Sequence, residues 1–301
     1  MNQSCPICSI SDFTIIGNTK PNKIALEFIN KDYKVVKCRN CSTYFVHPYI
    51  DFNDSQWAEL YNSEYFAYQS EWLSKKRKKE LSERLSKAES FLNVSDKINF
   101  LDIGAGEGKT LIEGKKRKWN VTGIDIVDNR IDEAKDSSIN FLAGKFLEID
   151  LPENYYDIVY LDSVLEHVLQ PLEYISKIKR ILKPGGILYV GIPNEDCLFN
   201  MIRKTAFRLI GQGNISEKLK PFDSPYHVIG FNKSSFNYLI KKANLQIKYF
   251  RNFGRKFDFL SYKITSKAFW IALFFLLPIE FIGYLTQTDV YFEAYLSKED
   301  T

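Results

Sequence analysis

Glycines at positions 104, 106 and 108 follow a short apolar run, and this pattern restricts the possible folds more than any other feature of the chain. Residues 98–103 are typical of a buried parallel strand, and a helical stretch follows the glycines. Glycine lets a backbone approach a ligand that any side chain would keep away. The pattern therefore predicts a strand–loop–helix unit that contacts a nucleotide-like ligand. A dinucleotide fold requires G-x-G-x-x-G, whereas here the third glycine comes one residue early, so the loop alone is weak evidence.

The remainder of the chain continues this alternation of strands and helices. Besides 98–103, strands are predicted over 121–125, 139–143, 156–161, 187–192, 245–250 and 290–296. Helices are predicted over 71–92, 109–118, 129–135, 172–182 and 234–243. Repeated β–α units of this kind predict an α/β fold, with a Rossmann-like sheet of seven strands covered by helices on both faces.

Composition limits the classes of protein that the chain can belong to. With 301 residues, of which 45% are hydrophobic, it can bury a core and carry an accessory module. The net charge of +4 falls short of the strongly basic balance of a dedicated nucleic-acid binder. Because the first ten residues show no charged and then apolar pattern of a signal peptide, we expect a cytoplasmic location.

The run Leu-Asp-Ile-Gly-Ala-Gly-Glu-Gly at 101–108 resembles the first motif of class I methyltransferases, which use S-adenosyl-L-methionine. The resemblance implies that the loop passes under the methionine part of this cofactor. It also implies that Asp102 helps to bind the amino group of the cofactor. The expected loop residues are Gly104, Ala105, Gly106 and Gly108.

Later motifs of the same family follow in order through residue 194. The resemblance implies that Asp125 binds both ribose hydroxyls and that Ile126 packs on adenine. It also assigns cofactor contacts to Gly144, Lys145, Phe146 and Asp162, although members often have Asp where this chain has Lys145. The Lys-Pro-Gly-Gly turn at 183–186 completes the series, and a dehydrogenase-type Rossmann domain is the alternative.

Four cysteines form two C-x-x-C pairs, Cys5 with Cys8 and Cys38 with Cys41. Two such pairs supply the four thiolates of a tetrahedral zinc site, in which every coordination position is filled. The alternatives are a redox pair or two disulfides, which a reducing compartment disfavours. We therefore expect a structural Zn²⁺ ion, while the fifth cysteine, Cys197, has no partner in the sequence.

The order of modules is similar to that of sugar C-methyltransferases of deoxysugar pathways, in which a zinc ribbon precedes the methyltransferase core. Aromatic motifs at 44–48, 60–62 and 65–66 contribute to this resemblance. We predict a zinc ribbon over 1–50, a helical linker over 51–97, and a methyltransferase domain over 98–301. Insertions are expected at 195–230 and 252–288.

The four candidate catalytic residues are Glu166, His167, Tyr226 and His227. Glu166 and His167 resemble a motif of ubiquinone-pathway O-methyltransferases, in which an earlier Glu joins the pair to bind a divalent ion. That position is Ser163 here, so no second metal is predicted. His167 could instead be a general base with a pKa near neutrality, or the pair could cap and orient a helix. Tyr226 or His227 could also remove a proton from the acceptor, or His227 could be structural.

The segment 268–285 is nearly all apolar but contains Pro278 and Glu280. It is slightly short for a spanning helix, so we expect a buried or lid helix. Peripheral contact with a membrane, for an acceptor on a lipid carrier, is the other interpretation.

Three functions remain open. The first is methylation, on carbon or oxygen, of a small molecule such as a nucleotide sugar or glycan precursor. The second is methylation of ribosomal RNA, which the basic runs at 75–79 and 115–118 would favour, although no base-stacking platform is evident. The third is a cofactor-binding protein without catalysis. The oligomeric state and the acceptor are not defined by these motifs.

Overall fold

A seven-stranded sheet carries the glycine loop in the computed structural model, which describes residues 4–60, 71–93, 97–216, 218–223, 225–254 and 264–298. The strand order is β10-β11-β8-β7-β4-β5-β6, and β11 is antiparallel to both of its neighbours. The strands are β4 (Asn99–Ile103), β5 (Asn120–Asp125), β6 (Ile139–Ala143), β7 (Tyr156–Asp162), β8 (Leu182–Pro193), β10 (Leu245–Phe253) and β11 (Tyr291–Lys298). The predicted α/β class and seven strands are confirmed.

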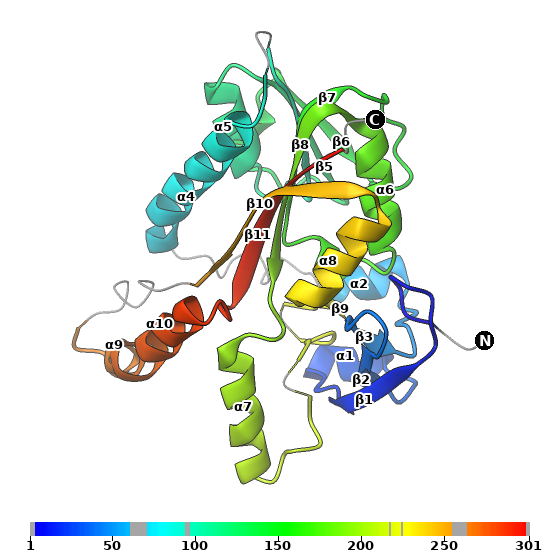
Figure 1. Ribbon diagram of the computed structural model, residues 1–301, viewed down its shortest axis with the longest axis vertical. Coiled ribbons are helices and arrows are strands. Elements are labelled where there is room, and N and C mark those ends of the chain that lie inside the picture. The colour runs from blue at the N-terminus through cyan, green and yellow to red at the C-terminus, as the bar shows by residue number, and fades with distance from the viewer. Residues whose placement is uncertain are drawn as a thin grey trace.

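Helices cover both faces of this sheet, with α4 (Glu71–Glu89) and α5 (Lys109–Lys116) on one side (Figure 1). On the other side lie α6 (Pro171–Ile181) and α8 (Lys233–Lys242). Proline at the first position of α6 is favourable, since its missing N–H would be unpaired there in any case. The α-helix predicted over 129–135 is wrong, because only a short 3₁₀ helix forms there, over Asp132–Lys135. Its one buried residue is Ala134.

A smaller sheet holds the cysteine-bearing segment, with strand order β1-β2-β3-β9. Its first three strands are β1 (Phe13–Asn18), β2 (Lys34–Cys38) and β3 (Tyr44–His47), accompanied by helices α1 (Lys23–Phe28) and α2 (Asp54–Leu60). The fourth strand, β9 (Ile229–Gly230), comes from a segment about 180 residues later and pairs with Tyr44 and Phe45. Residues 61–62 and 65–66 of the aromatic motifs lie outside the described residues.

One hydrophobic core runs from the small sheet into the large one. Buried Phe45 and Val46 of β3 belong to the same cluster as Leu161 of β7, Ile178 of α6 and Phe236 of α8. A second cluster, between α4, α5 and the opposite face of the large sheet, includes Leu85, Ala88 and Leu111. The shared first cluster fixes the cysteine-bearing module against the α6–α8 side of the sheet.

Two segments leave their apolar side chains outside these cores. Helix α7 (Leu198–Leu209) has no buried residue. The segment 267–285 forms α9 (Lys267–Ile271), a π-helical turn η4 (Ala272–Leu276) and α10 (Leu277–Leu285). Of the two expected arrangements, a buried helix or a lid helix, the buried one is wrong, because side chains such as Phe274, Phe275 and Leu285 are exposed. Among the described residues, no helix combines the length and apolar character that a membrane crossing needs.

A buried ion network joins α4 to the middle of the large sheet. The Arg84 side chain is 12% exposed, and its guanidinium lies 3.0 Å from Asp162 Oδ2 and 3.1 Å from Glu293 Oε2. Arg251 Nε lies 2.6 Å from the other oxygen of Glu293. Because Glu293 is itself almost fully buried, its charge depends on these two arginines.

We therefore expect Arg84→Met to lower the free energy of unfolding by about 3–5 kcal/mol, since it leaves buried carboxylates without their main cation. Arg251→Met is the matched control, because that side chain is 45% exposed and should contribute less. Urea denaturation followed by circular dichroism measures both. Equal unfolding midpoints for the two variants would contradict this assignment.

Candidate functional site

The glycine loop adopts a backbone that favours glycine at each of its three positions. The φ angles are +78° at Gly104, +51° at Gly106 and +77° at Gly108. The amides of Gly104 and Ala105 both donate to the Ile124 carbonyl, which joins the loop to the end of β5. The Ala105 side chain is buried in the core and anchors the loop on that side, while the opposite side of the loop faces away from the core.

The three glycines are needed for different reasons. A Cβ at Gly104 would lie 2.6 Å from Val164, and one at Gly108 would lie 2.5 Å from Ala134. Both are therefore packing constraints. A Cβ at Gly106 would meet no atom within 4 Å. Gly106 is thus the position at which a ligand can approach the backbone and a side chain would compete with it.

Asp125 ends β5 beside this loop, and its two carboxylate oxygens receive backbone N–H groups. Gly106 N–H donates to Oδ2 at 2.7 Å, and Ile126 N–H donates to Oδ1 at 2.7 Å. Each oxygen keeps a further lone pair that can accept from a hydroxyl. The neighbouring Ile126 and Val127 side chains are exposed, so an apolar surface lies next to the carboxylate. This arrangement suits a ribose and its base.

Three carboxylates gather where β4, β5 and β7 end. The pKa of Asp102 is raised to about 8, chiefly because the carboxyl group is buried. A hydrogen bond with the Thr110 side chain lowers this pKa, whereas the charges of Asp125 and Asp162 raise it. Burial also raises the pKa of Asp125, while the amides of Gly106 and Ile126 counteract it. Like charges this close in a low dielectric attract a cation strongly. This edge of the sheet therefore favours a positively charged ligand.

The other two expected contact regions are held differently. Gly144, at φ +145°, donates its amide to the Asp125 carbonyl, while Lys145 is exposed. The Phe146 ring is buried against Tyr174, with ring centroids 5.1 Å apart, and so contributes to packing. Gly144 is thus hydrogen-bonded to the end of β5, and the ring of Phe146 packs in the core.

Asp162 lies at the end of β7 within a network that sequence reasoning missed. Its carboxylate accepts from Arg84 at 3.0 Å and from the Tyr291 hydroxyl at 3.0 Å. Tyr291 also shares a hydrogen bond with the Ser163 hydroxyl. Arg84 and Tyr291 come from α4 and β11, far away in sequence. No local pattern marks them, although Arg84 stands on the helix whose apolar stripe was recognised.

A second group of titratable side chains follows β7. Glu166 lies in a short 3₁₀ helix (Leu165–His167), and its Oε1 atom lies 3.9 Å from His227 Nε2. The rings of His167 and His227 meet edge to face, with centroids 5.0 Å apart. The Val228 amide donates to the Glu166 carbonyl at 2.9 Å, so the backbone holds the two segments together. The structure therefore unites three of the four expected catalytic residues.

The fourth, Tyr226, is oriented differently. Its hydroxyl forms a hydrogen bond with the side chain of Asn22, and burial raises its pKa. The backbone carbonyl of Tyr226 accepts a hydrogen bond from the ring of His167. The structure thus turns the Tyr226 side chain toward the cysteine-bearing module and leaves His227 beside Glu166.

The expected histidine pKa near neutrality is wrong. Burial lowers the pKa of His167 to about 4, and it lowers that of His227 well below its ordinary value. Burial also raises the pKa of Glu166 well above its ordinary value, and neither of its carboxylate oxygens has a hydrogen-bond partner among the described residues. At neutral pH both imidazoles are uncharged and can accept a proton.

The same three side chains also offer ligand atoms for a metal ion. One donor atom from each of Glu166, His167 and His227 lies within 4.8 Å of the others. Ser163 offers no carboxylate at the position expected for a third ligand, but His227, distant in sequence, supplies a third donor atom. Two imidazoles and a carboxylate form a set that divalent ions accept in proteins.

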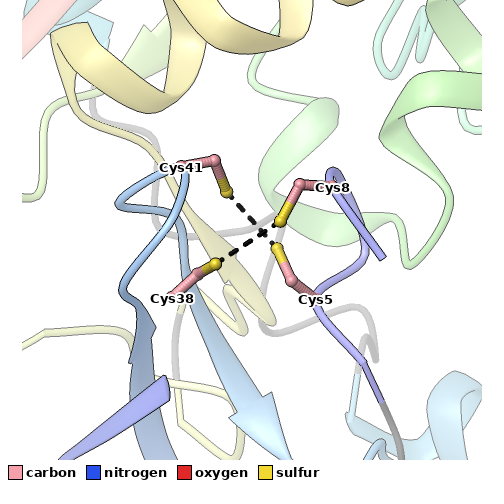
Figure 2. Close-up of side chains that lie close together, drawn as sticks. All are labelled: Cys5, Cys8, Cys38 and Cys41. Carbon is pink, nitrogen blue, oxygen red and sulfur yellow. Dashed lines mark hydrogen bonds between the residues drawn. The ribbon is translucent and has the colours of Figure 1, made fainter. Parts of the chain in front are cut away.

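The four cysteines of the N-terminal module converge, as Figure 2 shows. Cys5 Sγ lies 3.4 Å from Cys41 Sγ, and Cys8 Sγ lies 3.5 Å from Cys38 Sγ. All four are buried and free of disulfides. Sulfurs bound to one tetrahedral zinc lie roughly 3.8 Å apart, so the four thiols fit such an ion. The hydrogen bond from Cys5 lowers the pKa of Cys41 to about 5, which favours a thiolate.

Comparisons with known proteins agree with this geometry. The model of the family described as "Methyltransferase domain" matches residues 61–259, more than half of the chain. A ubiquinone biosynthesis O-methyltransferase of Rickettsia bellii is 28% identical over 117 residues, which cover 37% of this chain and 48% of that protein. A probable S-adenosylmethionine-dependent methyltransferase of Mycolicibacterium smegmatis is 25% identical over 152 residues, covering 49% and 52%. The chain thus spans about a third to a half of the length of the curated relatives it matches.

One solved structure shares the fold over nearly the whole chain. The 1,6-didemethyltoxoflavin-N1-methyltransferase of Burkholderia thailandensis, crystallised with 1,6-didemethyltoxoflavin and S-adenosylhomocysteine, has a TM-score of 0.51 and 14% sequence identity. The alignment covers 94% of this chain and 100% of that one. At this identity the likeness concerns the fold.

The raised pKa of Asp102 makes a prediction about stability. The ordinary pKa is 3.8 and the folded value is about 8, so the stability gained from the neutral carboxyl is complete in acid and is lost as the pH rises through 8. Asp102→Asn stays neutral throughout. We expect its thermal midpoint to exceed that of the wild type by a margin that grows between about pH 5 and about pH 8.

Thermal melts in matched buffers measure this margin. Asp157→Asn is a useful comparison, because that buried carboxylate is paired with Lys183 and its loss should destabilise the fold. A margin for Asp102→Asn that stays constant with pH would contradict the assignment.

Proposed function

The chain belongs to the methyltransferase domain family and has the class I S-adenosylmethionine-dependent fold, and from this premise we propose that it methylates a small molecule. The proposed acceptor is a nucleotide sugar or a glycan precursor, methylated on carbon or oxygen. The main support is the cluster of three carboxylates beside the glycine loop. S-adenosylmethionine carries two cationic groups, an ammonium and a sulfonium, and such a pocket suits it.

Different residues of the chain would bind different parts of the cofactor. Asp102 would accept from the ammonium group, and Asp125 would accept from the ribose hydroxyls with the lone pairs that Gly106 and Ile126 leave free. The exposed Ile126 side chain would cover the base. The sulfonium supplies an already activated methyl group, so the protein contributes position and an acceptor that has lost its proton.

The acceptor side is assigned to the Glu166–His167–His227 cluster. His227 is uncharged at neutral pH, and its Nε2 atom faces Glu166, so it can take a proton from an acceptor hydroxyl or carbon acid. His167 is held by its bond to the Tyr226 carbonyl and would orient His227. The cluster is enclosed where β9 joins the cysteine-bearing module, and this position favours a small acceptor.

The basic run at 115–118 gives little support to an RNA substrate. Lys115 pairs with Asp136, Lys116 with Glu133, and Arg117 with Glu89 and Glu113. Charges paired in this way are poorly available to phosphates. In the other run, the side chains of residues 75–77 lie outside the described part of the chain.

Transfer of labelled methyl groups to a panel of nucleotide sugars tests the proposal directly. We expect the native protein to label at least one sugar. His227→Ala should lower transfer by about a hundredfold or more with the cofactor Kd nearly unchanged, because it removes the base alone. Gly106→Arg should abolish cofactor binding. Its Cβ would meet no atom within 4 Å, but the φ of +51° strains any side chain by about 1–2 kcal/mol, so its circular dichroism and thermal midpoint are measured alongside.

Calorimetry with S-adenosylmethionine separates the possible failures. Equal binding by the Gly106→Arg variant and the native protein would show that the cofactor lies elsewhere. Tight binding without transfer to any acceptor would favour a non-catalytic protein. Labelling of total RNA, with binding that falls steeply with salt, would exclude the sugar proposal.

We also propose that Cys5, Cys8, Cys38 and Cys41 hold a structural zinc ion. The purified protein should contain about one zinc per chain, and Cys38→Ser should reduce this below about a tenth and lower the thermal midpoint. Cys197→Ser is the matched control, since that buried thiol lies outside the cluster and should leave the zinc content unchanged. Metal analysis by mass spectrometry measures both, and full zinc content in the Cys38 variant would contradict the proposal.

A further inference from the structure

An apolar helical surface, made of α7 and residues 267–285, is the most unusual part of the molecular exterior. More than half of the large hydrophobic side chains that are exposed among the described residues lie on these two segments. They include Leu209 at 83%, Phe275 at 66% and Leu285 at 65% exposure. Contiguous apolar patches this rich indicate a partner or a membrane, because isolated hydrophobic residues are the norm elsewhere.

The two segments form one continuous surface. Helices α7 and α10 are in contact, and in Figure 1 both project from the end of the large sheet at which β8 ends and β11 begins, α7 downward and α10 toward the left. Within η4 and α10 the buried residues are small, Ala272 and Gly283. The helices therefore rest on the protein through small side chains and direct their large ones outward.

Charge and aromatic content indicate the kind of partner. Helix α7 contains Arg203, Lys204 and Arg208 and no acidic residue, and α9 begins with Lys267. Lys204, Arg208 and Lys267 are exposed. Exposed Trp270 lies among the apolar side chains, and tryptophan favours the boundary between lipid head groups and acyl chains. Apolar helices with a cationic edge bind anionic membrane surfaces.

Two other occupants fit less well. A second copy of this chain, packed with the twofold axis near α7, would bring the three cations of α7 close to the same cations of its partner. A membrane-spanning helix is disfavoured, because Pro278 and Glu280 lie in the first turn of α10, directly after the π-helical turn.

We propose that the apolar helical surface binds the anionic face of a lipid bilayer, with α7 and the helices of 267–285 lying in the plane of the interface. Phe274, Phe275 and Leu285 enter the boundary region, while Lys204 and Arg208 contact the head groups. The site of methyl transfer remains in the aqueous part of the protein, so this binding does not depend on the identity of the acceptor.

Co-sedimentation with vesicles tests the proposal. The native protein should bind vesicles of phosphatidylcholine mixed with phosphatidylglycerol, and should bind pure phosphatidylcholine at least about tenfold more weakly. The double variant Phe274→Glu/Phe275→Glu should lose binding to both. Lys204→Glu/Arg208→Glu should lose the preference for anionic vesicles, and that preference should also fall with salt in the native protein.

A matched control changes exposed apolar residues elsewhere. Ile15→Glu/Leu26→Glu removes two exposed aliphatic side chains on β1 and α1, adds the same charge, and should bind vesicles like the native protein. The emission of Trp270, obtained as the difference between native protein and Trp270→Phe, should shift to the blue on anionic vesicles.

Three results would overturn the proposal. One is native protein that stays in the supernatant with anionic vesicles. Another is a dimer, seen by light scattering, that the Phe274→Glu/Phe275→Glu change dissolves, since a second copy would then be the occupant. The last is equal loss of binding in the control variant. Cofactor binding, measured on every variant, shows that each is folded and keeps this test separate from that of the proposed function.

Discussion

The gathering of three carboxyl groups at one edge of the sheet, with Asp102 fully buried, is the constraint on which the surrounding structure depends. Asp102, Asp125 and Asp162 are brought together because parallel strands end at one edge of a sheet, and a fold that places them there must compensate their charge. Asp125 is compensated by the amide of Gly106 in the glycine loop and by those of Ile126 and Val127, and Asp162 by Arg84 and Tyr291. Asp102 keeps the least compensation. With a pKa of about 8 its carboxyl is mostly neutral at neutral pH, and a cation bound beside it would favour the charged form, whereas an anionic ligand would not.

Helix α4 and the cysteine-bearing module lie on either side of the end of β7. Helix α4 delivers Arg84 to β7 from one face, and the cysteine-bearing module covers the other side through β9. Since Val228 donates to the Glu166 carbonyl and Val46 donates to the Val228 carbonyl, one short segment connects the small sheet to the histidine cluster. Damage to the four-cysteine site would therefore disturb His227 without touching the glycine loop.

Sequence reasoning located what depends on local pattern. The glycine spacing, the acid that ends β5 and the two C-x-x-C pairs each follow from short-range chemistry. In the structure Gly106 bonds to Asp125 and the four cysteines converge, while the ligands assigned to them stay predictions. It failed where distant segments meet. Arg84, Tyr291 and the approach of His227 to Glu166 arise from tertiary packing, and the lowered histidine pKa values arise from burial that a motif does not encode. The prediction of a buried helix over 268–285 was wrong because apolar composition alone does not distinguish a buried helix from an exposed one.

The strand order of the small sheet also affects how the chain is made. All four cysteines and three strands lie within the first 47 residues, yet the fourth strand, Ile229–Gly230, leaves the ribosome after three quarters of the chain. During synthesis the cysteine-bearing module can thus fold early, but the outer edge of β3 stays unpaired meanwhile. A nascent chain stalled between these two points would display an open strand edge, which is a surface that chaperones and aggregating neighbours both recognise.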